Sequence, residues 1–172
     1  MKKIKGILDI KIRSKLKAGE EVLFSGEFYT ARDQAHKIMG ERIRTGRKLP
    51  FELKDTIIYY CGPTPSPPGQ TIGACGPTTS LRMDDFTEIL LKQGVVATVG
   101  KGRRSEKVRR AIKRYKAVYF AAPSGCGAFL ATKVLKKEIV AFPQLGPEAV
   151  YRLEVRGFPL IVAIDAQGRS IY

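Results

Sequence analysis

The sequence predicts an α/β fold with a central, largely parallel sheet, helices on one side of it, and a second, smaller sheet. Three observations predict this. Apolar strand-like segments alternate with amphipathic helical segments through the middle of the chain, the order typical of parallel sheets. Towards both ends strand-like segments follow one another without helices, which indicates antiparallel pairing in the smaller sheet. No repeat or linker divides the chain, so we expect one domain over residues 1–172.

The first part of the chain predicts two strands and a helix. Leu8, Ile10 and Ile12 alternate with charged residues, so a strand is expected over Ile7–Ile12. A second strand, Glu21–Phe28, follows a Gly turn and ends at Tyr29 or Thr30. The spacing of apolar residues over Ala31–Ile43 is helical.

In the middle of the chain, segments with the pattern of strands alternate with segments that have the pattern of helices. Strands are expected over Thr56–Tyr60, Val95–Val99 and Ala117–Ala121. A helix is expected over Ser80–Gln93, with Gly94 as its C-terminal cap. A second, strongly basic helix lies within residues 101–116.

The last part of the chain begins with a turn of small residues, Pro123–Ala128, that opens a helix through about Leu135. Three short apolar segments follow without further helices. They predict strands over Glu138–Phe142, Tyr151–Val155 and Leu160–Ile164.

Composition excludes several classes of protein. The chain has no apolar run long enough to span a bilayer and no leader-like start, so a cytoplasmic location is expected. Cys61, Cys75 and Cys126 are too few and too far apart for a disulfide framework or a zinc site. Cys61 and Cys75 each precede a Gly-Pro corner and could lie near each other. We therefore predict no metal ligand in this chain.

The net charge of +15 raises the alternative of a nucleic-acid-binding module. The basic residues are densest between Lys101 and Lys116, where Val108, Ala111, Ile112 and Tyr115 would form an apolar stripe. A solvated helix face, an acidic partner or attraction of an anionic substrate would explain the same charge. No known RNA- or DNA-binding motif is present, so nucleic acid is not the expected partner.

The run Gly76–Asp84 is the most informative feature for function. A Gly-Pro corner leads directly into a predicted helix start, where free N–H groups and the helix dipole favour an anion. Arg82 would lie one turn after Thr78 on the same face. A second Gly-Pro-Thr corner, at Gly62, comes earlier, and the pair predicts a pocket for a small carboxylate.

Arg32, Arg82 and Lys101 each lie at a predicted strand-to-helix turn. Such turns gather at the carboxyl edge of a parallel sheet, so the three cations are expected to surround one cleft suited to a dicarboxylate. Arg32 could instead form a surface ion pair with Asp33 or Glu41, and Lys101 could be a solvated turn residue.

Two further residues have alternative interpretations. His36, the only histidine, could orient the surroundings of Arg32 or titrate, but a structural role is favoured. Asp84 could cap the helix start or pair with Arg82.

Five segments resemble the β subunit of class I iron–sulfur fumarate hydratases, which is also the C-terminal part of single-chain class I fumarases and the β subunit of L-tartrate dehydratase. The resemblance covers nearly the whole chain in order. The segments that carry it are Thr30–His36, Tyr60–Pro65, Gly76–Asp84, Gly100–Gly102, and Leu153–Val155 with Phe158–Pro159.

The resemblance implies a swivelling β/β/α domain and a hydro-lyase that converts fumarate and L-malate, with tartrate dehydration as the alternative. It also implies a partner α subunit that holds a four-iron four-sulfur cluster through its own cysteines, and assembly into a higher oligomer. Arg32, Arg82 and Lys101 match the ligands of the substrate carboxylates. Thr78 matches the proposed base; because a free hydroxyl is a poor base at pH 7, positioning the substrate is the alternative role.

Overall fold

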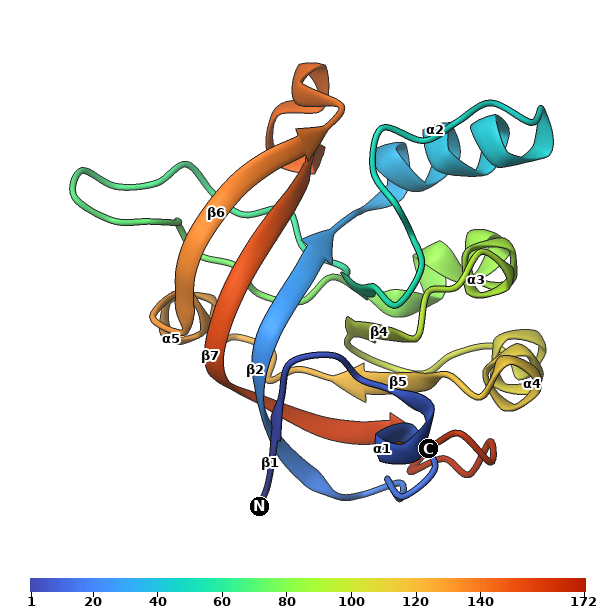
Figure 1. Ribbon diagram of the computed structural model, residues 1–172. Coiled ribbons are helices and arrows are strands. Elements are labelled where there is room, and N and C mark those ends of the chain that lie inside the picture. The colour runs from blue at the N-terminus through green and yellow to red at the C-terminus, as the bar shows by residue number, and fades with distance from the viewer.

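The computed structural model describes all residues, 1–172, and is built on one seven-stranded mixed sheet flanked by helices (Figure 1). The elements, in chain order, are β1 (Lys2–Lys5), α1 (Ile10–Arg13), β2 (Glu21–Thr30), α2 (Asp33–Arg44), β3 (Ile57–Tyr59), the 3₁₀ helix η1 (Ser80–Met83), α3 (Asp84–Lys92), β4 (Ala97–Gly100), α4 (Glu106–Tyr115), β5 (Val118–Ala121), α5 (Gly127–Ala131), β6 (Val134–Ala141), the 3₁₀ helix η2 (Pro143–Glu148) and β7 (Val150–Ile164).

The sheet closes on itself. Its strand order is β1-β2-β3-β4-β5-β7-β6, and β2 also pairs with β7, so five strands form a barrel-like ring with β1 and β6 outside it. The pairs from β1 to β5 are parallel, whereas β7 is antiparallel to β2, β5 and β6. The predicted central parallel strands are therefore confirmed, but the predicted second sheet is wrong, because the C-terminal strands join the same sheet.

The two strands predicted over residues 151–164 are one continuous strand. Opposite β2, Val155 pairs with Gly26 and Phe158 with Phe24, so β7 holds one extra residue at this point. Gly157 takes a φ of 60°, which a glycine adopts without strain, and lets β7 bend there without breaking. This bend allows one strand to pair with three neighbours.

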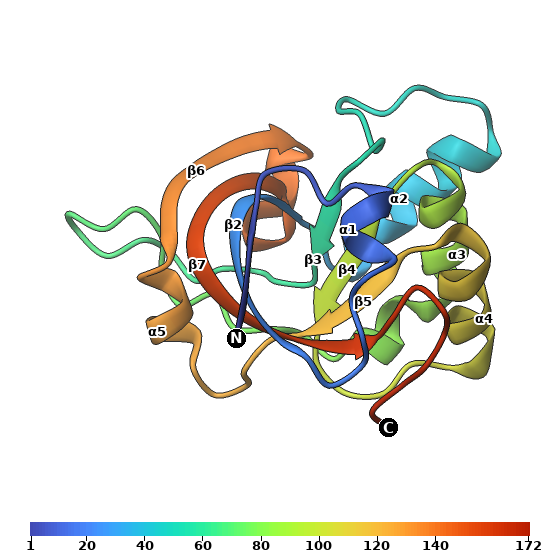
Figure 2. The ribbon, with the colours of Figure 1, turned by 60° about the horizontal axis from the view of Figure 1, so that its bottom comes forward.

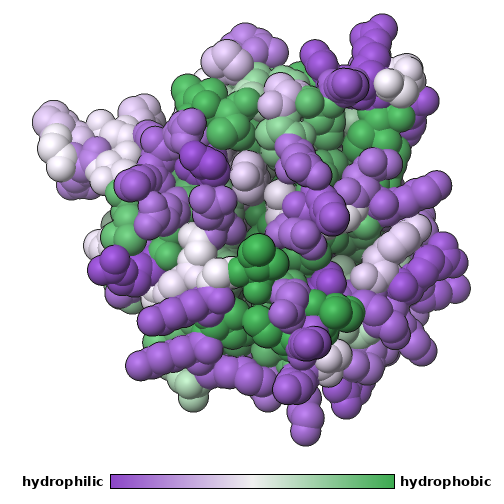
Figure 3. Space-filling view, viewed as in Figure 1, coloured by the Kyte–Doolittle hydropathy of each residue, from purple (hydrophilic) through white to green (hydrophobic).

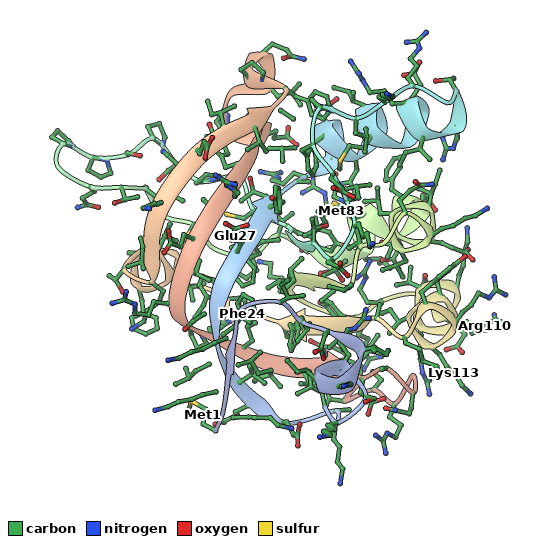
Figure 4. All side chains as sticks on the ribbon, viewed as in Figure 1. Met1, Phe24, Glu27, Met83, Arg110 and Lys113 are labelled. Carbon is green, nitrogen blue, oxygen red and sulfur yellow. The ribbon has the colours of Figure 1, made fainter.

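Alternate residues of the parallel strands face two separate cores. Tyr59 and Phe120 belong to the core inside the ring, where the Tyr59 ring packs against those of Phe28 and Phe158. Neighbouring residues point outwards, to a second core under α2, α3 and α4. Those three helices lie on one side of the ring, as predicted (Figures 1 and 2), and Met83 points inward beneath them (Figure 4).

The N-terminal prediction is wrong. The segment Ile7–Ile12 is not a strand, because the Asp9 side chain accepts the Ile12 N–H at 2.8 Å and starts the short helix α1. The first strand is instead the Lys-rich β1, in which only Ile4 is buried. No amphipathic alternation marks such an edge strand, so its sequence carries little signal.

Two helices differ from their predicted lengths. The segment Ser80–Gln93 begins with the 3₁₀ turn η1 and becomes α-helical only at Asp84, and Gly94 follows its end with a φ of 102°, as expected for a cap. The helix predicted through Leu135 ends at Ala131, because Val134 already pairs with Val155 in β6. No helix of the structure has both the length and the apolar character to cross a membrane.

Candidate active site

The Gly-Pro-Thr corner that begins at Gly76, the later of the two in the chain, lies between the ends of β3 and β4. The Thr78 N–H donates to the Tyr60 carbonyl at 2.7 Å, and the Lys101 N–H donates to the Thr78 carbonyl at 3.3 Å. The Ser80 N–H donates to the Lys101 carbonyl at 2.9 Å, and Thr79 forms a parallel bridge with Lys101. Thr78 and Lys101, distant in sequence, are therefore held side by side by the backbone.

Gly100 makes this close approach possible. A Cβ atom at Gly100 would lie 2.0 Å from the Ser80 Oγ and 2.8 Å from the Tyr60 ring. Only a residue without a side chain fits there, so the glycine of the Gly100–Gly102 turn is required for the corner and β4 to meet.

The helix that was predicted to follow this corner begins only at Ser80, after Thr78. The N–H groups of Thr78 and Ser80 are already bonded to Tyr60 and Lys101, and Thr79 is not helical, with ψ of 117°. Arg82 therefore does not lie one helical turn after Thr78. Two backbone N–H groups of this corner are therefore used inside the protein and are not free for an anion.

Arg82 and Arg32 meet at one carboxylate. The Nε and Nη2 atoms of Arg82 both donate to the Asp33 carboxylate at 3.0 Å. The Nη2 atom of Arg32 lies 3.8 Å from the same carboxylate. The ion pair of Arg32 with Asp33 proposed from the sequence is thus present, but it is the weaker of the two contacts.

Arg32 also lies across the first Gly-Pro corner. A Cβ atom at Gly62 would lie 2.9 Å from the Arg32 Cδ, so this glycine leaves room for the side chain. Its Nε is buried and has no hydrogen-bond partner in the protein. Arg32 therefore lies close to both corners. Gly62, which it contacts, belongs to the earlier corner and lies two residues after Tyr60, whose carbonyl accepts the Thr78 N–H of the later corner.

The four predicted site residues belong to one connected region. One pair, Thr78 and Lys101, is joined by backbone bonds, and the other, Arg32 and Arg82, by Asp33. The region is only partly buried, because the side chains of Arg32 and Arg82 are 29% and 51% exposed. A pocket of about 430 Å³ lies between β1, β2 and the start of β3, but none of the four residues lines it. A small anion bound here would remain partly uncovered by this chain.

Sequence reasoning missed a buried arginine beside this region. The side chain of Arg104 is fully buried; it donates to Asp84 at 2.6 Å, to Thr87 at 2.6 Å, and to Thr98 and Tyr60 at 3.1 and 3.2 Å. Asp84 also accepts the Ser105 N–H at 2.6 Å. The pairing of Asp84 with Arg82 considered from the sequence is therefore wrong, because Asp84 faces the interior.

Comparisons with known proteins identify the family. The family described as "Fumarase C-terminus" matches residues 6–172. The chain belongs to this fumarase C-terminus family. The resemblance inferred from the corner motifs is thereby confirmed, and the two corners, the Arg32 turn and the Lys101 turn all lie inside the matched range.

Three relatives are similar to this chain, but they differ in how much of their own length the similarity covers. The chain is 44% identical to "Putative L(+)-tartrate dehydratase subunit beta" of Methanocaldococcus jannaschii, over 92% of this chain and 84% of the relative. It is 36% identical to "Fumarate hydratase 2" of Leishmania major and 37% identical to "Fumarate hydratase class I, anaerobic" of Escherichia coli. These alignments cover 94% and 86% of this chain but only 29% and 27% of those relatives.

The three cysteines of this fumarase C-terminus domain are free thiols. Cys61 and Cys75 are buried, and Cys126 is exposed. Burial raises the pKa of Cys61, with a further contribution from Cys75, and both side chains belong to the core inside the ring. Burial also raises the pKa of Cys75 to about 12. Both are thus kept as neutral thiols, and no group of three or more His, Cys, Asp or Glu side chains could hold a metal ion.

His36 is buried behind Arg32 and does not titrate near neutral pH. Its Nδ1 lies 2.7 Å from the Arg32 carbonyl, and its Nε2 has no partner. Burial is the main cause that lowers the pKa of His36 to about 4; the bond to Arg32 opposes this and Arg104 adds to it. His36 contacts the main chain of Arg32, in line with the structural role favoured from the sequence.

We expect His36 to reduce stability in mild acid. Its folded pKa of about 4 lies below the ordinary value of ~6.5, so between these values the unfolded chain binds a proton that the folded chain does not. Stability is therefore lost as the pH falls through this window, by about 2 kcal/mol between pH 7.5 and pH 5. Urea unfolding of wild type and His36→Asn at both pH values measures this loss as the difference between their pH dependences. Equal dependences would contradict it.

Proposed function

We propose that this chain is the β subunit of a class I fumarate hydratase, which reversibly hydrates fumarate to L-malate together with an α subunit. One observation carries the proposal most directly: two arginines converge on a single carboxylate beside the Thr78–Lys101 corner. The Asp33 carboxylate occupies the kind of position that a substrate carboxylate would take. The fork of two N–H donors is the geometry that binds carboxylates most strongly.

In this proposal three side chains bind the substrate and a fourth transfers a proton. Arg82 and Arg32 would hold one end of the dicarboxylate, and Lys101, as a point charge, the other. Fixing both ends places the reacting carbon beside Thr78, and such orientation is worth on the order of 7 kcal/mol or more in favourable cases. Thr78 would exchange the carbon-bound proton; the alternative is that its hydroxyl only positions the substrate.

We propose that the four-iron four-sulfur cluster implied by the resemblance is held by the α subunit. The cysteines here do not fit it, because two are buried neutral thiols and the third is alone on the surface. In the family this cluster supplies a Lewis acid for the leaving hydroxyl. This chain supplies the carboxylate-binding side.

The α subunit would cover the open face of the site. The fumarate hydratase relatives are more than three times as long as the segment they share with this chain, whereas the tartrate dehydratase relative is named a subunit. The loop from Cys61 to Thr79 carries no charged residue and extends from the body as a pale surface (Figure 3). A neutral loop on so basic a chain fits contact with a protein partner.

The remaining expectations follow the same proposal. The 172 residues would act as one domain that swivels against the α subunit, within a higher oligomer. One continuous sheet supports the single domain. The three free cysteines fit a reducing compartment such as the cytoplasm.

L-Tartrate dehydration is the alternative activity, favoured by the higher identity and similar length of the tartrate dehydratase relative. Nucleic-acid binding is not favoured by the structure. Within residues 101–116, Arg104 is buried, Arg109 donates to the Gly168 carbonyl and Arg114 pairs with Glu88. Arg110 and Lys113 do point away from the body (Figure 4), but as part of a broken basic face.

Reconstitution tests the proposal. The purified chain should be colourless and inactive, and mixing it anaerobically with the cysteine-bearing α subunit should give fumarate hydration, tartrate dehydration or both. Fumarate, L-tartrate and methylated fumarates assayed on the same complex rank the substrates. A complex that acts on none of these dicarboxylates, or a chain that instead binds DNA with steep salt dependence, would refute it.

A further inference from the structure

Arg104 lies at the centre of a buried polar cluster next to the Thr78–Lys101 corner. Its side chain has no exposed surface, and its guanidinium lies over the rings of Tyr60 and Tyr119, 5.3 and 4.9 Å from their centroids. Its donors reach Asp84 and Thr87 on α3 and Thr98 on β4. The cluster therefore joins β4, β5, the residue that follows β3 and the first half of α3.

A second set of bonds runs from this cluster to the Thr78–Lys101 corner. The Tyr119 hydroxyl donates to the Gly102 carbonyl at 2.8 Å and lies 2.9 Å from the Ser80 Oγ. Ser80 in turn donates its N–H to the Lys101 carbonyl. Gly102 and Ser80 are the immediate neighbours of Lys101 and Thr79, so Tyr119 fixes both sides of the corner.

The charge of Arg104 is balanced inside the protein. Burial opposes the charged form, but Tyr60, Asp84 and Tyr119 outweigh it and raise the pKa of Arg104 above its ordinary value. The rigid planar guanidinium makes four hydrogen bonds to different elements, an arrangement that a lysine cannot reproduce. Its neighbour Arg103 is exposed and has none of these contacts.

We infer that Arg104 and Tyr119 are positioning residues, which set where Lys101 and Thr78 lie relative to Arg82 without touching the substrate. This inference rests on the proposed function for its kinetic consequences. Loss of either residue would shift the lysine away from the carboxylate and so raise KM, and would shift Thr78 and so lower kcat. A residue that only stabilised the fold would change the amount of active complex and leave KM unaltered.

Two variants test this in the assembled complex. Arg104→Lys should raise KM for the dicarboxylate at least fivefold and lower kcat at least tenfold. Tyr119→Phe, which removes one hydroxyl and leaves the ring, should raise KM at least threefold with the complex fully folded. Arg103→Lys and Tyr115→Phe make the same chemical changes on side chains outside the cluster, and should stay within twofold of wild type.

Hydrogen exchange gives a readout that does not need activity. In both variants the amides of Ser80 and Lys101, which bond across the corner, should exchange at least tenfold faster than in the two controls. If Arg104→Lys does not fold, the test depends on Tyr119→Phe alone. Unchanged KM or unchanged exchange in Tyr119→Phe would overturn the inference, whereas a wild-type complex without activity would refute the proposed function and leave the exchange test valid.

Discussion

Arg82→Ala should remove most of the activity of the assembled enzyme and leave the fold intact. In the structure the guanidinium donates to the Asp33 carboxylate through two parallel N–H groups, and in the proposed complex the same groups would bind a substrate carboxylate. Charge-assisted hydrogen bonds contribute roughly 1.5–3 kcal/mol each. Their loss corresponds to a decrease in kcat/KM of about 100-fold or more. Because the side chain is 51% exposed, its removal should cost less than about 1 kcal/mol of stability.

Steady-state kinetics of the complex with fumarate and L-tartrate check this result. Arg110→Ala, an exposed arginine on α4, is the matched control and should behave as wild type. Arg82→Lys keeps the charge without the fork and should fall between wild type and alanine. Retention of near-full turnover by Arg82→Ala would remove Arg82 from the site.

The largest expected loss of stability is that of Asp84→Ala. Asp84 is 7% exposed and is the carboxylate paired with Arg104, whose side chain is fully buried. Removing one partner of a buried pair leaves the other charge uncompensated, at a cost of about 3–5 kcal/mol. The variant also leaves the Ser105 N–H without its acceptor.

Urea unfolding at neutral pH measures this loss. Asp85→Ala is the matched control, because Asp85 is the next residue of α3 and is exposed. It should change the free energy of unfolding by less than about 0.5 kcal/mol. A difference between the two variants of less than about 1 kcal/mol would show that the pair with Arg104 contributes little.

The sequence pattern correctly predicted those strands and helices whose structure is determined by residues close to one another in the sequence. The parallel strands and the helices α2, α3 and α4 follow from alternation and helical spacing, because each is amphipathic or buried in its own right. The strand β1 and the continuity of β7 did not follow. Both depend on pairing with β2, which lies elsewhere in the sequence.

The candidate site was likewise predicted only in part. The corner motifs predicted that Arg32, Arg82, Lys101 and Thr78 would gather, and the structure does bring them into one region, while their roles stay predictions. Arg104 was missed because it lies in a run of basic residues and its neighbour Arg103 is exposed. The ion pair with Asp84 and the convergence of Tyr60 and Tyr119 on its guanidinium distinguish it, and no local pattern indicates these contacts.

The pairing of β2 with β7 has a consequence for biosynthesis. Residues 21–29 pair with residues 152–161, so the growing polypeptide cannot close its ring on the ribosome until nearly the whole sequence has been translated. Until then β2 and β5 each expose an unpaired edge that could pair with another nascent chain. We therefore expect that ending translation before Val150 yields an insoluble product, even though every residue of the candidate site would already have been made.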